Sequence, residues 1–258
     1  MRLMDVTFVC VVVVQVLCLT YARSPRWKSF LYMLPIPFSF ALLSSGRGVD
    51  ITHVAGFWIV WGLLWGVYLL HTRRRVPIVV AITCGVVLFC LCGVLLARWL
   101  PSAGTAVEVP AFWVGLVLIW GVGVMAMFRR HGVEPGHRTR LPAWIKIPLV
   151  VMIIVGLIES RPWLRGFMPT FPLVTIFVLY EARYSLRTLV YRVPIFLVSA
   201  VPMLVVLRVM VPFGGGDPER IALGLGAAWL VFVPVYLLTE RWYVHAEKGT
   251  GTPTTRSN

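Results

Sequence analysis

Nine apolar stretches separated by short polar loops constrain the fold of this chain more than any other feature of its sequence. A bilayer core about 30 Å thick is crossed by roughly 20 apolar residues of helix, because backbone groups in hydrocarbon must find their hydrogen bonds within the segment. The chain has 258 residues, of which 59% are hydrophobic and only 13% are charged. Little polar sequence is left for a soluble domain, so we expect an all-α, polytopic transmembrane bundle. The predicted spans are residues 4–22, 30–45, 54–70, 76–100, 110–128, 141–158, 167–180, 193–212 and 221–239.

The basic residues are sorted between the two sides of the predicted membrane. Sixteen of the 24 lysines and arginines fall in loops on one side, around residues 23–28, 73–75, 129–140, 183–192 and 241–256, and six fall on the other side. Short loops rich in lysine and arginine stay in the cytoplasm. We therefore expect the N-terminus outside and the C-terminus in the cytoplasm. The net charge of +14 then reflects topology rather than binding to nucleic acid, and the expected partners are membrane lipids.

The second and seventh spans are short and interrupted by prolines. Pro35 and Pro37 lie in the second span, and Pro169 and Pro172 lie in the seventh. Proline removes an amide donor and clashes with the preceding turn of a helix. We therefore expect both segments to be kinked or partly unwound.

Shifted by 135 residues without gaps, the chain repeats itself around these prolines. The matching pairs are Arg26 and Arg161, Tyr32 and Phe167, Met33 and Met168, and Pro37 and Pro172. We expect a first repeat of four helices at residues 1–109, a linker helix with a basic cytoplasmic loop at 110–140, and a second repeat of four helices with a short polar tail at 141–258. This 4+1+4 arrangement inverts the second repeat relative to the first, because an odd number of spans separates equivalent helices.

Inverted repeats with proline-broken helices at equivalent positions indicate a transporter site near the bilayer midplane. The candidate substrate-binding residues are Pro35, Pro37, Ser39, Pro169, Pro172, Thr175, Arg161 and Arg165. Ser39 and Thr175 follow the proline elements, where their hydroxyls either repair loosened helix carbonyls or bind a ligand. Arg161 and Arg165 either bind an anionic lipid headgroup or anchor the chain at the membrane–water interface. Prolines that serve only helix packing remain the alternative for both broken spans.

No ionisable residue is predicted at the bilayer centre. Asp5, Lys146 and Arg208 are expected to reach an interface by snorkelling, which disfavours an ion-coupled mechanism built on a buried carboxylate. We find no phosphate-binding loop, nucleophile elbow or metal-ligand spacing in the sequence. No catalytic residue, metal or cofactor is therefore predicted, and an intramembrane transferase is disfavoured.

The third span carries Trp58, Trp61 and Trp65 on one stripe beside Gly62 and Gly66. Two glycines four residues apart let helices approach closely. They predict a packing face, either inside the protein or in a homodimer. The tryptophans are more typical of packing than of a ligand cage.

The second half of the chain resembles the GlpM-like family of small bacterial inner-membrane proteins. The resemblance rests on Phe-Met-Pro-Thr-Phe-Pro at 167–172, followed by Tyr-Glu-Ala-Arg at 180–183 and by Arg187. The first copy departs from it, since Pro-Ile-Pro-Phe at 35–38 reorders the motif. Family members are about one copy long, so the resemblance implies a fused, duplicated form in a bacterial inner membrane. It implies a loose link to the cell envelope and exopolysaccharide, and no site residue.

These observations favour a transporter or flippase-like facilitator that moves a small or lipid-like substrate through a cavity at the two broken helices. The alternative is a non-transporting scaffold or accessory subunit of a cell-envelope or exopolysaccharide assembly, bound to an assembly partner. In that case the broken helices are packing kinks.

Overall fold

The computed structural model describes residues 3–22, 24–46, 48–101, 104–128, 165–211 and 217–249, together with residues 134, 148, 151, 152, 155 and 156. Every regular element within these residues is a helix. In chain order they are α1 (Leu3–Tyr21), α2 (Pro25–Met33), α3 (Ile36–Ser45), α4 (Ile51–Tyr68), the π-helical turn η1 (Leu69–Arg73), α5 (Ile78–Trp99), α6 (Glu108–Met127), the 3₁₀ turn η2 (Arg165–Thr170), α9 (Leu173–Glu181), α10 (Leu186–Met210) and α11 (Pro218–Gly249).

Five of these helices are long and apolar enough to cross a membrane, as expected of an integral membrane protein. They are Ile51–Arg73, Ile78–Trp99, Glu108–Met127, Leu186–Met210 and Pro218–His245. The first predicted span corresponds to α1, a shorter apolar helix. The second and seventh predicted spans are each divided into two short helices, and most of the sixth lies outside the described residues.

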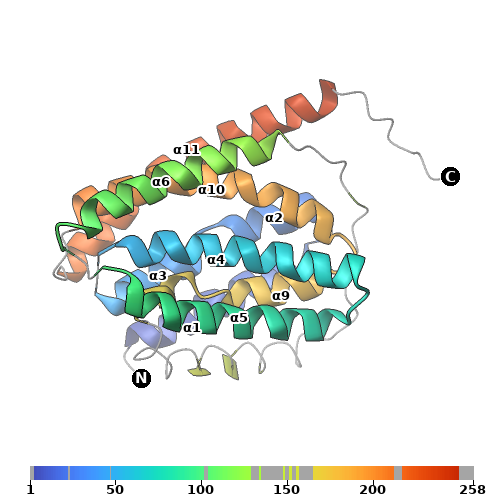
Figure 1. Cartoon of the computed structure of the whole chain (residues 1–258), viewed down its shortest axis with the longest axis horizontal. Coiled ribbons are helices and arrows are strands. Elements are labelled where there is room, and N and C mark those ends of the chain that lie inside the picture. Colours follow the sequence, from blue (N-terminus) through green and yellow to red (C-terminus); the bar gives the residue numbers. More distant parts are fainter. Residues whose placement is uncertain are drawn as a thin grey trace.

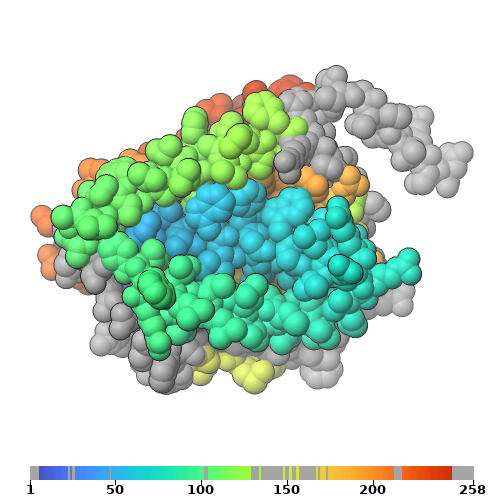
Figure 2. Space-filling view, in the orientation of Figure 1, coloured from blue at the N-terminus to red at the C-terminus, as the bar shows by residue number. Residues whose placement is uncertain are grey.

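The helices form a bundle with connecting segments at its two ends, which we call the outer and inner ends after the predicted topology (Figure 1). The outer end is the one at which α3 leads into α4 and α10 leads toward α11. The inner end is the one at which α4 leads into α5 and α9 leads into α10. Helices α4, α5 and α6 lie across one face of the bundle (Figure 2).

Helix α10 is the most enclosed of the five candidate spans. It buries 61% of its most apolar stretch, against at most 39% in the others. It packs against α2, α4, α6 and α11. Helix α10 is therefore the central helix among the described spans.

The loop that joins α3 to α4 has a fixed geometry. Gly46 ends α3 in the left-handed region at φ 66° and donates its amide to the carbonyl of Leu42, which is the usual way for a glycine to close a helix. Asp50 then caps α4 by accepting the amide of Thr52. His53 Nδ1 lies 3.2 Å from the Asp50 amide nitrogen and 2.9 Å from its Oδ1, so it accepts the amide when it lacks a proton and donates to the carboxylate when it carries one. The outer end is thereby ordered close to the candidate site described below.

Candidate functional site: the crossing of two broken helices

The first break lies between α2 and α3. Leu34 is extended, with φ −64° and ψ 123°, and Pro35 begins the next helix. Because Pro35 has no amide hydrogen, the carbonyl of Leu31 loses its helical partner four residues on. The Gln15 side chain of α1 donates to that carbonyl at 2.8 Å instead. Ser39 Oγ donates to the Pro35 carbonyl at 2.8 Å, and this carbonyl also accepts the Ser39 amide at 3.0 Å, so the hydroxyl adds a second bond to a carbonyl that keeps its helical partner.

The second break lies between η2 and α9 and has the same cap geometry. Pro35 has φ −76° and ψ 38°, and Pro172 has φ −76° and ψ 45°. Each proline carbonyl accepts the amide four residues on at 3.0 Å, from Ser39 in the first case and Ile176 in the second. Pro35 and Pro172 therefore cap their helices in the same way, although the ungapped shift of 135 residues pairs Pro172 with Pro37. The internal repeat stays a prediction.

The two breaks lie against each other. Helix α2 contacts α9, while α3 contacts η2, so the first part of each broken span meets the second part of the other. Tyr32 Oη and Thr175 Oγ1 are 3.0 Å apart, and this hydrogen bond joins residues 143 positions apart in the chain. On the neighbouring α4, Gly56 lies so close to Thr170 that an added Cβ would be 2.7 Å from the Thr170 Cβ. The crossing is thus closely packed.

The crossing is buried and carries neutral polar groups. Ser39 and Thr175 are only 7% and 4% exposed. The Ser39 hydroxyl also accepts the indole N–H of Trp229 from α11 at 2.9 Å. Gln15 is buried, and its Oε1 has no hydrogen-bond partner among the described residues. Such an acceptor costs about 1–3 kcal/mol unless a donor reaches it.

The structure brings most of the predicted site residues together. Pro35, Ser39, Pro172 and Thr175 line the crossing, and Pro169 is buried within η2. Pro37 lies in the first turn of α3 and Arg165 is the first residue of η2, whereas Arg161, Glu159 and Lys146 lie outside the described residues. The ligand-binding role of this set stays a prediction.

A buried ion pair closes the outer end. Arg208 of α10 donates to Glu108 of α6 and to the carbonyl of Val49, at 2.6 Å in each case. The same carboxylate accepts the amide of Ile51 at 3.1 Å. The guanidinium carbon lies 4.5 Å from the centre of the Phe112 ring. We call Arg208, Glu108 and the Val49 carbonyl the outer clamp.

The prediction that Arg208 snorkels to an interface does not include its buried pairing with Glu108. Arg208 is 8% exposed and Glu108 is 0% exposed. Two charges in a poorly hydrated region are stable only when they are paired and hydrogen-bonded, and each satisfies the other in this arrangement. The signal available in the sequence was a lone arginine near the outer end of one span and a lone glutamate at the outer end of another.

A second buried ion pair closes the inner end. Lys28 of α2 lies 4.0 Å from the Glu181 carboxylate of α9, and its ammonium donates to the Glu181 carbonyl at 3.4 Å. Both side chains are 4% exposed. We call this pair the inner clamp. Like the outer clamp, it joins residues from opposite halves of the chain, since they are 153 positions apart.

A third ion pair lies within the second half. Arg192, near the inner end of α10, donates to Glu240 of α11 at 2.9 Å. Arg192 is 2% exposed, and its Nη2 has no partner among the described residues. Helix α10 therefore carries one buried arginine toward each of its ends.

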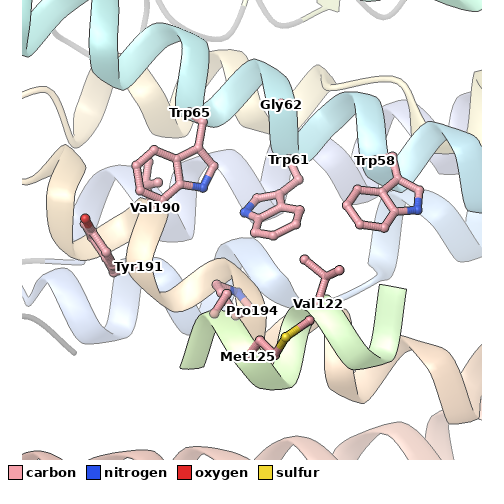
Figure 3. Close-up of a pocket in the computed structure, with 10 residues that line it drawn as sticks. Trp58, Trp61, Gly62, Trp65, Val122, Met125, Val190, Tyr191 and Pro194 are labelled. Carbon is pink, nitrogen blue, oxygen red and sulfur yellow. The ribbon is translucent and has the colours of Figure 1, made fainter. Parts of the chain in front are cut away.

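The tryptophan stripe of α4 lines a groove instead of a helix contact (Figure 3). A Cβ added at Gly62 or Gly66 would meet no atom within 4 Å. The two glycines are therefore not close-approach positions within the described part of this chain. Their use in a homodimer stays a prediction.

Within the described residues, no group of three histidine, cysteine or acidic side chains is arranged to hold a metal ion.

Compared with known proteins, the chain matches no family model, no curated protein and no solved structure. The resemblance to the GlpM-like family stays a prediction. The function is therefore argued from the crossing and the two clamps.

Proposed function

We propose that this protein is a membrane carrier that works by alternating access, with the two broken helices at its centre. The observation that carries the proposal is the crossing itself, at which Tyr32 of the first half bonds Thr175 of the second. Broken helices from two inverted repeats, meeting near the bilayer midplane, are the arrangement that secondary transporters use to build a substrate site.

The helix boundaries support two repeats of opposite orientation. Helices α4 and α10 begin at Ile51 and Leu186, 135 residues apart. The caps at Pro35 and Pro172 have the same torsion angles within a few degrees. An inverted repeat predicts antiparallel pairing at the centre, and the contacts of α2 with α9 and of α3 with η2 follow that pattern.

In this proposal the two clamps are the gates. Alternating access requires contacts between the halves that open at one end while those at the other end hold. The outer clamp ties Arg208 to Glu108 and Val49, and the inner clamp ties Lys28 to Glu181. Since both are formed, the structure corresponds to a state closed at both ends.

The groups at the crossing suit a substrate without net charge at its bound part. Ser39, Tyr32 and Thr175 offer hydroxyls, and Gln15 offers an acceptor without a partner among the described residues. The charged groups lie at the clamps instead. We propose a small or lipid-like substrate whose neutral hydrogen-bonding group enters the crossing.

Cysteine labelling from each side of the membrane tests the proposal. The five native cysteines, all free thiols, are replaced, and one cysteine is introduced at Thr175 or at Ser39. A membrane-impermeant maleimide is then added to one side of sealed vesicles. With intact clamps we expect protection, because both positions are buried. Opening the outer clamp with Glu108→Gln should give labelling from one side only, and opening the inner clamp with Lys28→Met should give labelling from the other side only.

A matched control separates gating from unfolding. Ser199 of α10 is 0% exposed and donates its hydroxyl to the Ile195 carbonyl of the same helix at 2.7 Å. A cysteine at this position should stay protected in both clamp variants. Protection of Thr175→Cys and Ser39→Cys from both sides in every variant would overturn the carrier proposal and leave the scaffold function. Labelling of the Ser199 control would show a loss of packing and would equally count against gating.

A further inference from the structure

A groove in the membrane-facing surface lies between α4, α6 and α10 and has a volume of about 470 Å³. One wall carries Trp58, Trp61 and Trp65 of α4, and Gly62 lies between them (Figure 3). The remaining lining residues are Val122, Met125, Ala126, Val190, Tyr191 and Pro194. The lining is almost entirely apolar, so its natural occupant is hydrocarbon.

The shape of the groove follows from the course of α4 and α6. Near the outer end the two helices touch, since a Cβ at Gly115 would lie 2.9 Å from the Val54 side chain. Toward the inner end they diverge (Figure 1). The open space begins at Trp58 and reaches Tyr191, whose ring lies 5.2 Å from that of Trp65. The groove is therefore deepest in the inner half of the bundle.

The volume matches a single lipid chain better than a helix. The volume of 470 Å³ lies within the range of about 300–1,000 Å³ that pockets for small apolar ligands have, which suits one slender chain. A transmembrane helix is about 10–12 Å across with its side chains and needs more room than this. The vacancy beside Gly62 thus suits an extended acyl chain.

Hydrocarbon alone gives no selectivity, because bilayer lipid is as apolar as the groove. The charge at its inner mouth supplies the missing preference. Arg187 lies on the same face of α10 as Val190, Tyr191 and Pro194, at spacings of three, four and seven residues. It is exposed, and no ion-pair partner for it is found among the described residues. Glu134 is the nearby acid; its Oε2 accepts the amide of Thr188 at 3.1 Å, and no ion pair joins it to Arg187 among the described residues.

We propose that this groove binds one chain of a phospholipid with an anionic headgroup, whose phosphate lies against Arg187. The arginine donates two parallel bonds to phosphate oxygens, while the chain lies beside Gly62 and the tryptophans. This inference does not depend on transport, because a carrier and a scaffold would both present the groove to lipid.

Native mass spectrometry of the purified full-length protein tests the proposal through the lipid it retains. The probes are phosphatidylglycerol, diacylglycerol with the same chains, and inorganic phosphate. One arginine near a membrane surface contributes roughly a fivefold preference, so phosphatidylglycerol should be retained about fivefold better than diacylglycerol. Inorganic phosphate alone should not bind. Arg187→Gln should remove the preference while leaving diacylglycerol retention unchanged.

The groove itself is tested with Gly62→Leu, which fills space that no other residue occupies. This variant should lower retention of both lipids at least fivefold. Gly226→Leu on α11 and Arg241→Gln are matched controls, since Gly226 is equally open and Arg241 is equally exposed, and both should leave retention unchanged. A phosphatidylglycerol carrying a diazirine on its chain should cross-link to peptides of α4, α6 or α10.

Three results would overturn the proposal. They are unchanged retention in Gly62→Leu, equal retention of phosphatidylglycerol and diacylglycerol by the native chain, and a protein dimer that Gly62→Leu abolishes. The last result would assign the face to a second copy. None of the three bears on labelling at Thr175, so this proposal and the carrier proposal fail separately.

Discussion

The outer clamp gives the sharpest test of how this bundle is held together, because its two charges can be removed one at a time. Arg208→Met keeps an unbranched side chain that packs against Phe112 but leaves Glu108, which is 0% exposed, without its cation. Glu108→Gln removes the other charge and keeps an amide oxygen for the Ile51 N–H. The combined variant contains neither charge.

The magnitudes follow from the burial of both groups. Removing one partner of a buried ion pair costs about 3–5 kcal/mol, because the remaining charge is uncompensated. We expect a loss of this size in the free energy of unfolding for Arg208→Met. Glu108→Gln leaves the Arg208 guanidinium, which is 8% exposed, without its anion and should cost about 3–5 kcal/mol for the same reason. The double variant should be more stable than Arg208→Met alone, since the second substitution removes the Glu108 carboxylate that Arg208→Met leaves buried without a cation.

The measurement is reversible unfolding in mixed micelles with a rising fraction of dodecyl sulfate, followed by circular dichroism. Arg241→Met is the control, because Arg241 is exposed and should change stability by no more than about 0.5 kcal/mol. The reasoning is refuted if the two clamp substitutions are additive, so that Glu108→Gln destabilises Arg208→Met as much as it destabilises the native chain. Additivity would mean that the two charges do not interact.

Two further predictions concern the packing of α4 and its cap. Gly56→Ala should be about 1–3 kcal/mol less stable than Gly226→Ala, because a Cβ overlaps Thr170 at the first position and meets nothing at the second; equal unfolding free energies would contradict the close packing. Although burial raises the pKa of Asp50, the hydrogen bond and charge of His53 lower it more, so the net pKa lies below its usual range. Ionised Asp50 therefore stabilises the fold above its unfolded pKa of about 3.9 and loses that effect as pH falls below it. The difference in unfolding free energy between the native chain and Asp50→Asn should be constant from pH 7 to 5 and shrink below pH 4; a difference that grows in acid would reverse the sign.

Hydropathy and proline chemistry predict the broad architecture. The five candidate spans of the structure lie on predicted spans, and both proline-interrupted segments are broken where Pro35 and Pro172 remove an amide. The hydrogen bond of the Ser39 hydroxyl to the Pro35 carbonyl also follows from local chemistry, since a serine within a helix can reach the carbonyl four residues before it. These features depend only on residues close together in the chain, so they can be predicted from a single sequence.

The clamps were not predicted because they depend on pairing between distant segments. Snorkelling is the default for a lone arginine near the end of a span, and only the fold reveals that Glu108 lies within reach of Arg208. Gln15 is a similar case, because the carbonyl that it binds becomes vacant only through Pro35 on another helix. The likeness of the caps at Pro35 and Pro172 is also hidden in the sequence, because it lies in backbone torsion angles and the ungapped shift pairs Pro172 with Pro37 instead.

Helix α10 connects these observations mechanically. Arg208 lies toward its outer end and Arg192 lies toward its inner end, and both are held by carboxylates of other helices. Between them, Pro194 and Pro202 each remove an intrahelical hydrogen bond, which lowers the cost of bending. A helix that is held by an ion pair near each end and bends easily between them can break one ion pair while the other stays formed. In the proposed carrier this property lets the outer clamp open while the inner end stays closed, and a rigid α10 would force both ends to move together.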